Sequence, residues 1–311
     1  MDDLVFYKKG KPIAIIAPST LFSRGADEIV VNGPAGISSF RCRDEQSLEN
    51  ALNETGALIQ GSPDEIQKIK KLLQNPVTSR TASYFLSVAH LCSDVIADME
   101  VLRNAKILVA GCGGIGSSVA MLLAGAGIQN LILTDNDFIE KSNLNRQLFW
   151  TLADLGHLKV DVLKNGLNAR FENLSITTHA EPCTLDLLKS LIPEQVHGAV
   201  ITADDPPTLA RDGVLIAEEF NIPVVSGGYL HHFSTSFLFK PEDARNLVDS
   251  VRSDHSTSLT RLPSGIMPSY GPVNFNLASV LCSNLISALA KNIFKGFESR
   301  VERWDSSRIV I

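Results

Sequence analysis

The fold is decided by one stretch, residues 106–161: KILVAGCGGIGSSVAMLLAGAGIQNLILTDNDFIEKSNLNRQLFWTLADLGHLKVD. It opens with an apolar run at residues 107–110, passes into four glycines and continues as a small-residue helical pattern to about Ala126. This order predicts a strand, a tight turn and a helix. Glycines let backbone amides approach a phosphate, and the positive end of the helix favours the anion. We therefore expect a phosphate-bearing nucleotide at Gly111, Gly113, Gly114 and Gly116.

A second apolar run, residues 131–134, ends in Asp135, near the spacing at which a Rossmann unit places its ribose-binding carboxylate. These features alone fit NAD, FAD or ATP. The following side chains favour ATP, because cationic and amide groups neutralise a triphosphate and a leaving pyrophosphate. They also disfavour an NAD-dependent oxidoreductase. The side chains concerned are Asp137, Asn143, Arg146, Gln147 and Lys159.

The motifs G-x-G-G-x-G, D-x-D, N-x-x-R-Q and the downstream lysine stand in a familiar order and spacing. Over residues 79–311 the chain resembles the ThiF/MoeB/ubiquitin-activating-enzyme superfamily. It is most similar to the peptide-modifying branch, which is represented by the enzymes that mature microcin C and pantocin A. Of these two, it resembles the pantocin A type more. The resemblance implies an α/β fold with a Rossmann-like, mostly parallel sheet and flanking helices. It also implies a homodimer that activates a carboxylate with ATP as an acyl adenylate.

Within this resemblance, the glycine turn is expected to position the phosphates and Asp135 the ribose. Arg146 and Lys159 would hold the triphosphate, with Asn143 and Gln147 orienting them. In the resembled family an arginine before the nucleotide-binding strand reaches the partner's ATP. Arg80 stands in about that place, and Arg103 is the competing candidate.

A further carboxylate, Asp204, follows the apolar strand predicted at residues 198–202. The carboxyl end of a parallel strand faces the ligand crevice of such folds. Asp204 is therefore expected to hold Mg2+, which prefers oxygen ligands, and the resemblance puts the magnesium-associated aspartate there. The neighbouring Asp205 is interpreted as the N-cap of a helix at residues 206–220.

Composition indicates a globular protein of one large or two ordinary domains: 311 residues, 44% hydrophobic and 20% charged. A formal net charge of -6 gives no basis for broad nucleic-acid binding. We found no apolar run of the ~18 residues that would span a membrane and no signal-peptide pattern, so a cytoplasmic location is expected.

The cysteines argue against both a disulfide framework and zinc, because they are odd in number, far apart and form no C-x-x-C pair. Most of the resembled family carries two such pairs. His231 and His232 are adjacent in a predicted strand and would point to opposite faces, so no metal site is expected from them. Cys183 is interpreted as an inert thiol in preference to a thioester-forming one. The five cysteines are Cys42, Cys92, Cys112, Cys183 and Cys282.

Residues 1–76 are predicted to form a small winged-helix-like α+β domain. Strands are expected at residues 13–17, 28–31 and 37–42, followed by two helices, the second opening at the capping box of Ser62 and Glu65. In the resembled enzymes this region is a peptide clamp that adds a leader segment to a sheet edge. The alternative is a structural appendage or dimer arm. Residues 77–311 would form the adenylation domain, starting with an amphipathic helical stretch to residue 103.

The remaining segments are less specific. Tyr229 could line the path of a substrate or simply pack. Residues 240–268 are polar and irregular, typical of the family's crossover loop, and no role is assigned to its Asp254, His255 or Arg261. A long core or interface helix is expected at residues 273–294 and a β-hairpin at residues 300–311.

The predicted function is Mg-ATP-dependent activation of a ribosomally made precursor peptide in antibiotic biosynthesis. By resemblance, the target is a glutamate side chain that then closes a ring. No protein nucleophile is required, because a carboxylate is already ionised near pH 7. Three alternatives stay open: adenylation of the carboxyl terminus of a sulfur-carrier or ubiquitin-like protein, nucleotidyl transfer to a peptide, and a non-catalytic nucleotide-binding partner.

Overall fold

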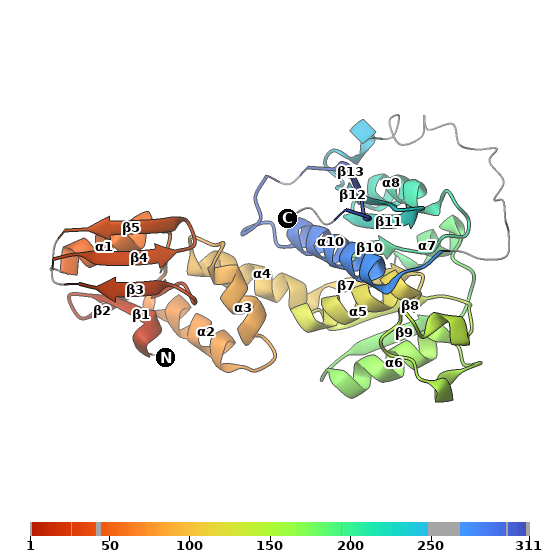
Figure 1. Cartoon of the computed structure of the whole chain (residues 1–311), viewed down its shortest axis with the longest axis horizontal. Helices are drawn as coiled ribbons and strands as arrows, with labels where there is room; N and C mark the ends of the chain where they lie inside the picture. Colours follow the sequence, from red (N-terminus) through yellow and green to blue (C-terminus); the bar gives the residue numbers. More distant parts are fainter. Residues whose placement is uncertain are drawn as a thin grey trace. The chain divides into compact units, whose positions relative to one another are not determined.

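The computed structural model describes residues 2–25, 27–41, 45–193, 195–247, 268–296 and 298–308 (Figure 1). The chain divides into two compact units. Unit 1 comprises residues 1–101 and 290–295, and unit 2 comprises residues 102–289 and 296–311. The division at residue 76 into a clamp and an adenylation domain remains a prediction about function. Residues Cys42, Asp254, His255 and Arg261 lie outside the described part of the chain.

Unit 2 is built on a seven-stranded sheet in the order β13-β12-β11-β10-β7-β8-β9. The five strands from β11 to β9 are parallel, and β12 and β13 continue the sheet in antiparallel pairing. The predicted mostly parallel α/β fold is thereby confirmed. The strands are β7 (Lys106–Ala110), β8 (Asn130–Thr134), β9 (Ser175–His179), β10 (Gly198–Ile201), β11 (Val224–Leu230), β12 (Phe233–Phe239) and β13 (Arg300–Asp305).

Helices cover both faces of this sheet, which is why its central strands are apolar on both sides. In β7, Ile107, Leu108 and Val109 are all fully buried. α5 and α10 pack together, and α8 packs against β10, β11 and β12 (Figure 1). The helices in the described part of unit 2 are α5 (Gly114–Ala126), α6 (Lys159–Arg170), α7 (Leu185–Leu191), α8 (Leu209–Phe220) and α10 (Gly271–Leu289), with 3-10 turns η2 (Lys141–Asn143), η3 (Leu152–Asp154) and η4 (Ala244–Leu247).

The strand order places a switch point between β7 and β10. From β7 the chain runs outward through β8 to β9, and then returns to pair β10 with the other side of β7. Loops that leave two such strands diverge and open a crevice at their carboxyl ends. The glycine turn after β7 and the Asp204 segment after β10 therefore meet at this crevice.

Unit 1 contains two three-stranded antiparallel sheets, β1-β2-β6 and β3-β4-β5. Its helix α2 opens with the predicted capping box, in which the Ser62 N–H donates to Glu65 Oε2 over 2.7 Å and the Glu65 N–H donates back to Ser62 Oγ over 3.4 Å. The elements are η1 (Asp2–Leu4), β1 (Val5–Lys8), β2 (Lys11–Ile16), β3 (Leu21–Arg24), β4 (Ile29–Gly33), β5 (Gly36–Phe40), α1 (Glu45–Glu54), β6 (Leu58–Gln60), α2 (Pro63–Gln74), α3 (Ser79–Leu86) and α4 (Cys92–Asn104).

Two expectations about local structure were wrong, those for His231 with His232 and for Asp205. His231 and His232 form the two-residue turn between β11 and β12, with His231 at φ +58°, instead of lying within a strand. Such short hairpin turns require positive φ, which alternation of apolar residues does not reveal. Of the segment predicted as a β-hairpin, residues 300–305 form β13 at the edge of the main sheet, and residues 309–311 lie outside the described part of the chain. Asp205 is not a helix N-cap, because α8 begins at Leu209 after Thr208. Residues that precede prolines avoid helical geometry, which delays the helix past Pro206 and Pro207.

α10 is shorter than predicted, ending at Leu289. The residues that follow belong to unit 1, where the buried Asp98 carboxylate accepts hydrogen bonds from Asn292 Nδ2 over 2.7 Å and from the Ile293 N–H over 2.8 Å. α10 is also long and apolar enough to cross a membrane by length and composition, although no such segment was predicted from the sequence. Half of its most apolar window is buried in the fold, as in a core helix.

Candidate functional site

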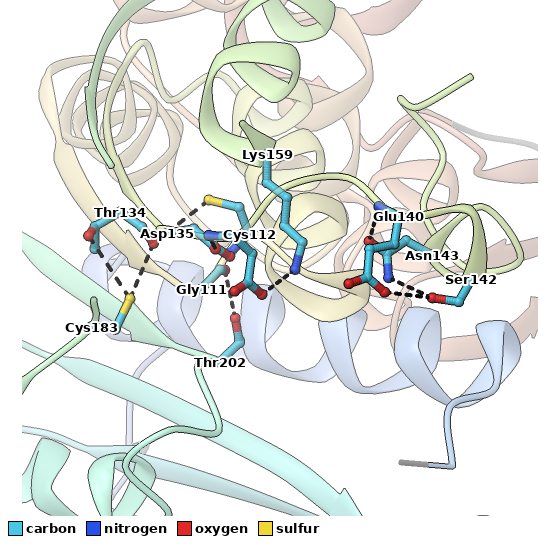
Figure 2. Close-up of polar contacts among 11 residues, drawn as sticks. Gly111, Cys112, Thr134, Asp135, Glu140, Ser142, Asn143, Lys159, Cys183 and Thr202 are labelled. Atoms are coloured by element: carbon cyan, nitrogen blue, oxygen red, sulfur yellow. Dashed lines mark hydrogen bonds and ion pairs between the residues drawn. The ribbon is translucent and has the colours of Figure 1, made fainter. Parts of the chain in front are cut away.

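The glycines after β7 make close packing possible. Gly111 has φ +86°, and a Cβ there would lie 2.5 Å from the backbone nitrogen of Ala203. A Cβ on Gly116 would lie 1.8 Å from the Gly111 carbonyl oxygen. That same oxygen accepts a 2.9 Å hydrogen bond from Thr202 Oγ1 (Figure 2). These two glycines thus bring the turn against the segment that follows β10, whereas a Cβ on Gly113 would meet open space.

Asp135 holds the glycine turn from the other side. Its carboxylate accepts a hydrogen bond from the Cys112 N–H over 2.6 Å (Figure 2). It also accepts one from the Asp137 N–H over 2.8 Å. Burial raises the pKa of this carboxyl, partly offset by Lys159 and the two backbone N–H donors. Asp135 is not among the described residues that line the adjacent cavity. Its bonds join β8 to the turn, and its assignment to the ribose stays a prediction.

Asp137 and Lys159 form an ion pair on the cavity wall. Lys159 Nζ lies 2.6 Å from Asp137 Oδ2, and the lysine N–H also donates to the Asp137 carbonyl oxygen over 3.0 Å. The lysine side chain is 9% exposed and that of the aspartate 63% exposed. Lys159 is the first residue of α6. Its ammonium group is therefore positioned at the start of this helix by Asp137, whose carboxylate remains open to solvent.

The SNLNRQ segment is shaped by its own amide groups. Asn143 Oδ1 accepts from the Glu140 N–H over 3.0 Å, closing the η2 turn. The Arg146 guanidinium donates through Nη1 to the Ser142 carbonyl oxygen over 2.8 Å. Gln147 is 5% exposed, and its Oε1 is one of the few buried polar atoms of the described residues without a hydrogen-bond partner. Because a buried polar atom is rarely left unsatisfied, this oxygen indicates a missing donor such as a ligand or water.

The opposite wall comes from sequence-distant segments. Asp204 is exposed at the end of the β10 loop. Asn274, in the first turn of α10, is 2% exposed, and its Nδ2 lies 3.3 Å from Ser269 Oγ. A Cβ added to Gly114 would lie 2.4 Å from that Nδ2, so the two walls touch. Tyr229 Oη and Ser269 Oγ are 2.7 Å apart.

Together these residues enclose a cavity of about 850 Å³ within unit 2. We call its two sides the motif wall and the distal wall. The motif wall consists of Gly113, Gly114, Ile115, Asn136, Asp137, Phe138, Glu140, Asn143, Arg146, Gln147 and Lys159. The distal wall consists of Thr202, Ala203, Asp204, Pro207, Ala210, Gly227, Gly228, Tyr229, Leu230, Pro268, Ser269 and Asn274.

The charges around the cavity suit a nucleotide triphosphate together with a divalent cation. The first turns of α5, α6 and α10 each contribute a lining residue, and helix N-termini favour anions. Lys159 and Arg146 add positive charge. Asp137, Glu140 and Asp204 also line the cavity and would repel phosphates unless a cation lay among them. Mg2+ fits this donor set, since it is usually bound by one or two carboxylates plus phosphate oxygens.

The cavity lining within the described residues includes neither Arg80 nor Arg103 and none of the four described cysteines. Arg80 is exposed on α3 in unit 1, and Arg103 lies in the last turn of α4. Cys183 is buried, its thiol donates to the Thr134 carbonyl oxygen over 3.3 Å, and burial raises its pKa to about 11. This environment favours the interpretation of an inert thiol. No group of three or more metal-binding side chains occurs within the described ranges.

Sequence reasoning missed several lining residues. Phe138 and Glu140 sit inside the predicted stretch, but no pattern marked them. Ser269 and Asn274 carry no motif at all. Asn274 follows a Gly-Pro pair at the start of an apolar helix. Only the structure shows that it is 2% exposed and that its amide lies against Gly114 of the glycine turn.

The sequence of this chain matches the model of a known protein family. The model described as the ThiF family matches residues 90–307. The chain belongs to the ThiF family. Among curated ThiF-type relatives, the adenylyltransferase and sulfurtransferase MOCS3 of Culex quinquefasciatus is 29% identical over 191 residues, which is 60% of this chain. The match spans only 42% of that relative's length.

Solved ThiF-like structures show the same fold over nearly the whole chain. The structure of E. coli MccB with ATP has a TM-score of 0.68 at 22% identity and covers 94% of this chain and 97% of that one. PaaA has a TM-score of 0.60 at 19% identity, covering 91% and 98%. MccB is also described as a microcin C7 biosynthetic enzyme and has been solved with N-formylated MccA. At these identities the likeness establishes the fold.

Proposed function

We propose that this chain uses ATP to adenylate a carboxylate on a ribosomally made precursor peptide. The observation that carries the proposal is the cavity itself, in which three helix N-termini, Lys159 and Arg146 surround a space that also holds carboxylates suited to a magnesium ion. Membership of the ThiF family, whose relatives include named adenylyltransferases, supports the same chemistry.

In the proposed reaction, a carboxylate oxygen of the substrate bonds to the α-phosphorus of ATP. The bond from that phosphorus to the bridging oxygen breaks, and its electron pair leaves with pyrophosphate. The attacking group is already ionised at neutral pH, so no general base is needed and the task is one of positioning. Lys159 and Arg146 would stabilise charge on the leaving pyrophosphate, while the amides of the glycine turn would orient the phosphates.

Asp204 is the proposed magnesium-holding residue, and a bound ion would draw negative charge from the phosphate oxygens. Asp204 is exposed and its carboxylate lines the distal wall, which leaves it available to a ligand. Asp137 and Glu140 are the other carboxylates that line the cavity, and Lys159 already pairs with Asp137.

A peptide substrate is supported by unit 1 and by the likeness to MccB, which has been solved with MccA. All four residues of β3 are exposed, and within the described residues β3 pairs only with β4. An edge strand of this kind can accept an extended peptide as an added strand. We extend the proposal to a glutamate side chain, ring closure and antibiotic biosynthesis by analogy with the peptide-modifying branch. A cytoplasmic homodimer in which Arg80 reaches the partner's ATP belongs to the same analogy.

A second candidate is adenylation of the carboxyl terminus of a sulfur-carrier protein. The MOCS3 relative favours it, since that protein is named an adenylyltransferase and sulfurtransferase. The two candidates separate by substrate: a small folded carrier in one case and short precursor peptides in the other.

The test is to mix the protein with Mg-ATP and the short peptides encoded beside its gene, then follow nucleotides and peptides by mass spectrometry. We expect AMP, pyrophosphate and a peptide that has lost water. Asp204→Ala should reduce AMP formation by about 100-fold or more while the protein stays folded. Asp205→Ala, beside it but outside the lining, is the matched control. An Asp204→Ala protein with normal turnover would remove this residue from the mechanism.

A further inference from the structure

A second cavity of about 830 Å³ in unit 2 adjoins the cavity between the motif wall and the distal wall, which we call the nucleotide cavity because the proposed function puts ATP there. Its wall comes from the turn after β11, the start of α10 and the end of β13. The two cavities share Tyr229, Pro268 and Ser269. Since Tyr229 Oη and Ser269 Oγ lie 2.7 Å apart, a hydrogen-bonded pair stands at the boundary between the two spaces.

The strand register explains how the second cavity is formed. Tyr229 of β11 lies opposite Ser234 of β12, which lies opposite Trp304 of β13. Residues directly opposite across antiparallel strands point to the same face of the sheet. Ser234 is fully buried and hydrogen-bonded to Ser306 Oγ over 2.5 Å. Two aromatic side chains thus rise from one face with a small residue between them.

Apolar groups dominate the chemistry of this cavity. Tyr270 is 64% exposed, and Pro272, Val273 and Trp304 line the same space. Asp305, the carboxylate among the described lining residues, forms an ion pair in which its Oδ2 lies 3.1 Å from Arg308 Nε. An exposed aromatic surface of this kind is typical of a binding site, since burying it against an apolar partner is favourable.

We propose that this second cavity, the aromatic cavity, binds an apolar side chain of the substrate peptide close in sequence to the activated carboxylate. The carboxylate then reaches the nucleotide past Tyr229 and Ser269. This inference rests on the proposed function and adds a substrate class: carboxylates flanked by aromatic or aliphatic residues. Continuity of the two cavities supports one occupant for both, because a chain seated in the second needs only to pass the shared residues to enter the first.

Tryptophan fluorescence gives a direct test that needs no ATP chemistry. The sequence has two tryptophans, of which Trp150 is 6% exposed and Trp304 lines the aromatic cavity. The Trp150→Phe protein isolates the Trp304 signal. The probes are three N-acetylated, amidated tripeptides, Phe-Glu-Phe, Leu-Glu-Leu and Lys-Glu-Lys. We expect the phenylalanine peptide to change the fluorescence with an affinity about tenfold or more above the lysine peptide.

A charged substitution should block the site. Val273→Arg places a guanidinium in the aromatic cavity and should weaken binding of the phenylalanine peptide by about tenfold or more, with the affinity for ATP unchanged. Val301→Arg is the matched control, because Val301 is 43% exposed on β13 and does not line the cavity. Binding in this control should equal that of the parent protein.

The outcomes separate this inference from the proposed function. Equal or absent fluorescence responses to all three peptides would overturn it, as would loss of ATP affinity in Val273→Arg, since the wall would then belong to the nucleotide site. Selective binding of the phenylalanine peptide that Val273→Arg removes supports it. If that binding occurs but no peptide ever yields AMP, the aromatic cavity stands as a peptide site and the adenylation proposal fails.

Discussion

The motif wall and the distal wall of the 850 Å³ cavity are built in opposite ways. The motif wall comes from one continuous stretch, residues 113–159, whose turns are closed by local bonds such as those that Asp135 accepts from the Asp137 N–H and Asn143 from the Glu140 N–H. The distal wall gathers the loop after β10, the end of β11 and the start of α10. One wall could therefore be recognised as a pattern, while the other exists only because the sheet and α10 bring its parts together.

The largest effect on stability is expected from Gly116→Ala, which tests the packing of the glycine turn against the segment after β10. In Gly116→Ala the new Cβ would lie 1.8 Å from the Gly111 carbonyl oxygen, which cannot move without disturbing β7. We expect a loss of about 4 kcal/mol or more of the free energy of unfolding, or no folded protein. Chemical denaturation measures it. Gly113→Ala, where the Cβ meets open space, should cost less than about 1 kcal/mol.

The Asp135→Asn substitution tests whether the stability of the motif wall depends on the charge of this carboxylate. The carboxylate accepts from two backbone N–H groups, and an amide has only one oxygen, so one donor loses its partner. We expect a loss of about 1–3 kcal/mol in the free energy of unfolding at pH 7. Unchanged stability would show that the two bonds contribute little.

The pH dependence of this variant has a defined sign. Burial raises the pKa of Asp135 above its ordinary 3.8, so the folded state holds the proton more tightly than the unfolded state. The contribution of this group to stability is therefore lost as pH rises from about 4 through the raised pKa. The advantage of the parent over Asp135→Asn should narrow over that window. Asp154 has the opposite sign, because its bonds to Thr151 lower its pKa below 3.8. Its contribution to stability is present above pH 3.8 and is lost as the pH falls through the lowered pKa.

A smaller effect measures the contact between the two walls. Gly114→Ala would place a Cβ 2.4 Å from Asn274 Nδ2, and the side chain of Asn274 would have to shift. We expect the single substitution to weaken ATP binding by about tenfold and Asn274→Ala to restore part of it in the double variant. A coupling energy of about 1 kcal/mol in the double-mutant cycle would support the contact. Additive effects would show that the walls act independently.

The smallest effect concerns Cys183. With its pKa raised to about 11, the thiol should stay protonated at pH 8 and react with iodoacetamide far more slowly than an unhindered cysteine. Cys183→Ala should form AMP at a rate close to that of the parent protein. A loss of turnover with retained adenylate would instead revive the thioester role.

The comparison of the walls also explains what could be predicted. Lys159 and Arg146 were identifiable because their residue types and spacing serve one chemical task within a local segment. Ser269 and Asn274 were not, because an amide at the start of an apolar helix has no distinctive pattern. Asp204 is an intermediate case. Its position after an apolar strand identified it as a candidate ligand. The predicted start of the following helix was wrong, because two prolines delay α8 to Leu209.

By itself, the sequence determined the glycine turn, the parallel strands around it and the cationic residues of the motif wall, because hydrophobic periodicity, glycine geometry and charge act over short stretches of chain. Tertiary structure alone decided the turn at His231 and His232, the end of α10 at Leu289, the distal wall and the aromatic cavity. These features depend on pairing between β11, β12 and β13 and on bonds to Asp98, which join residues far apart along the chain. Such contacts leave no local signature, since each partner alone is compatible with many neighbours.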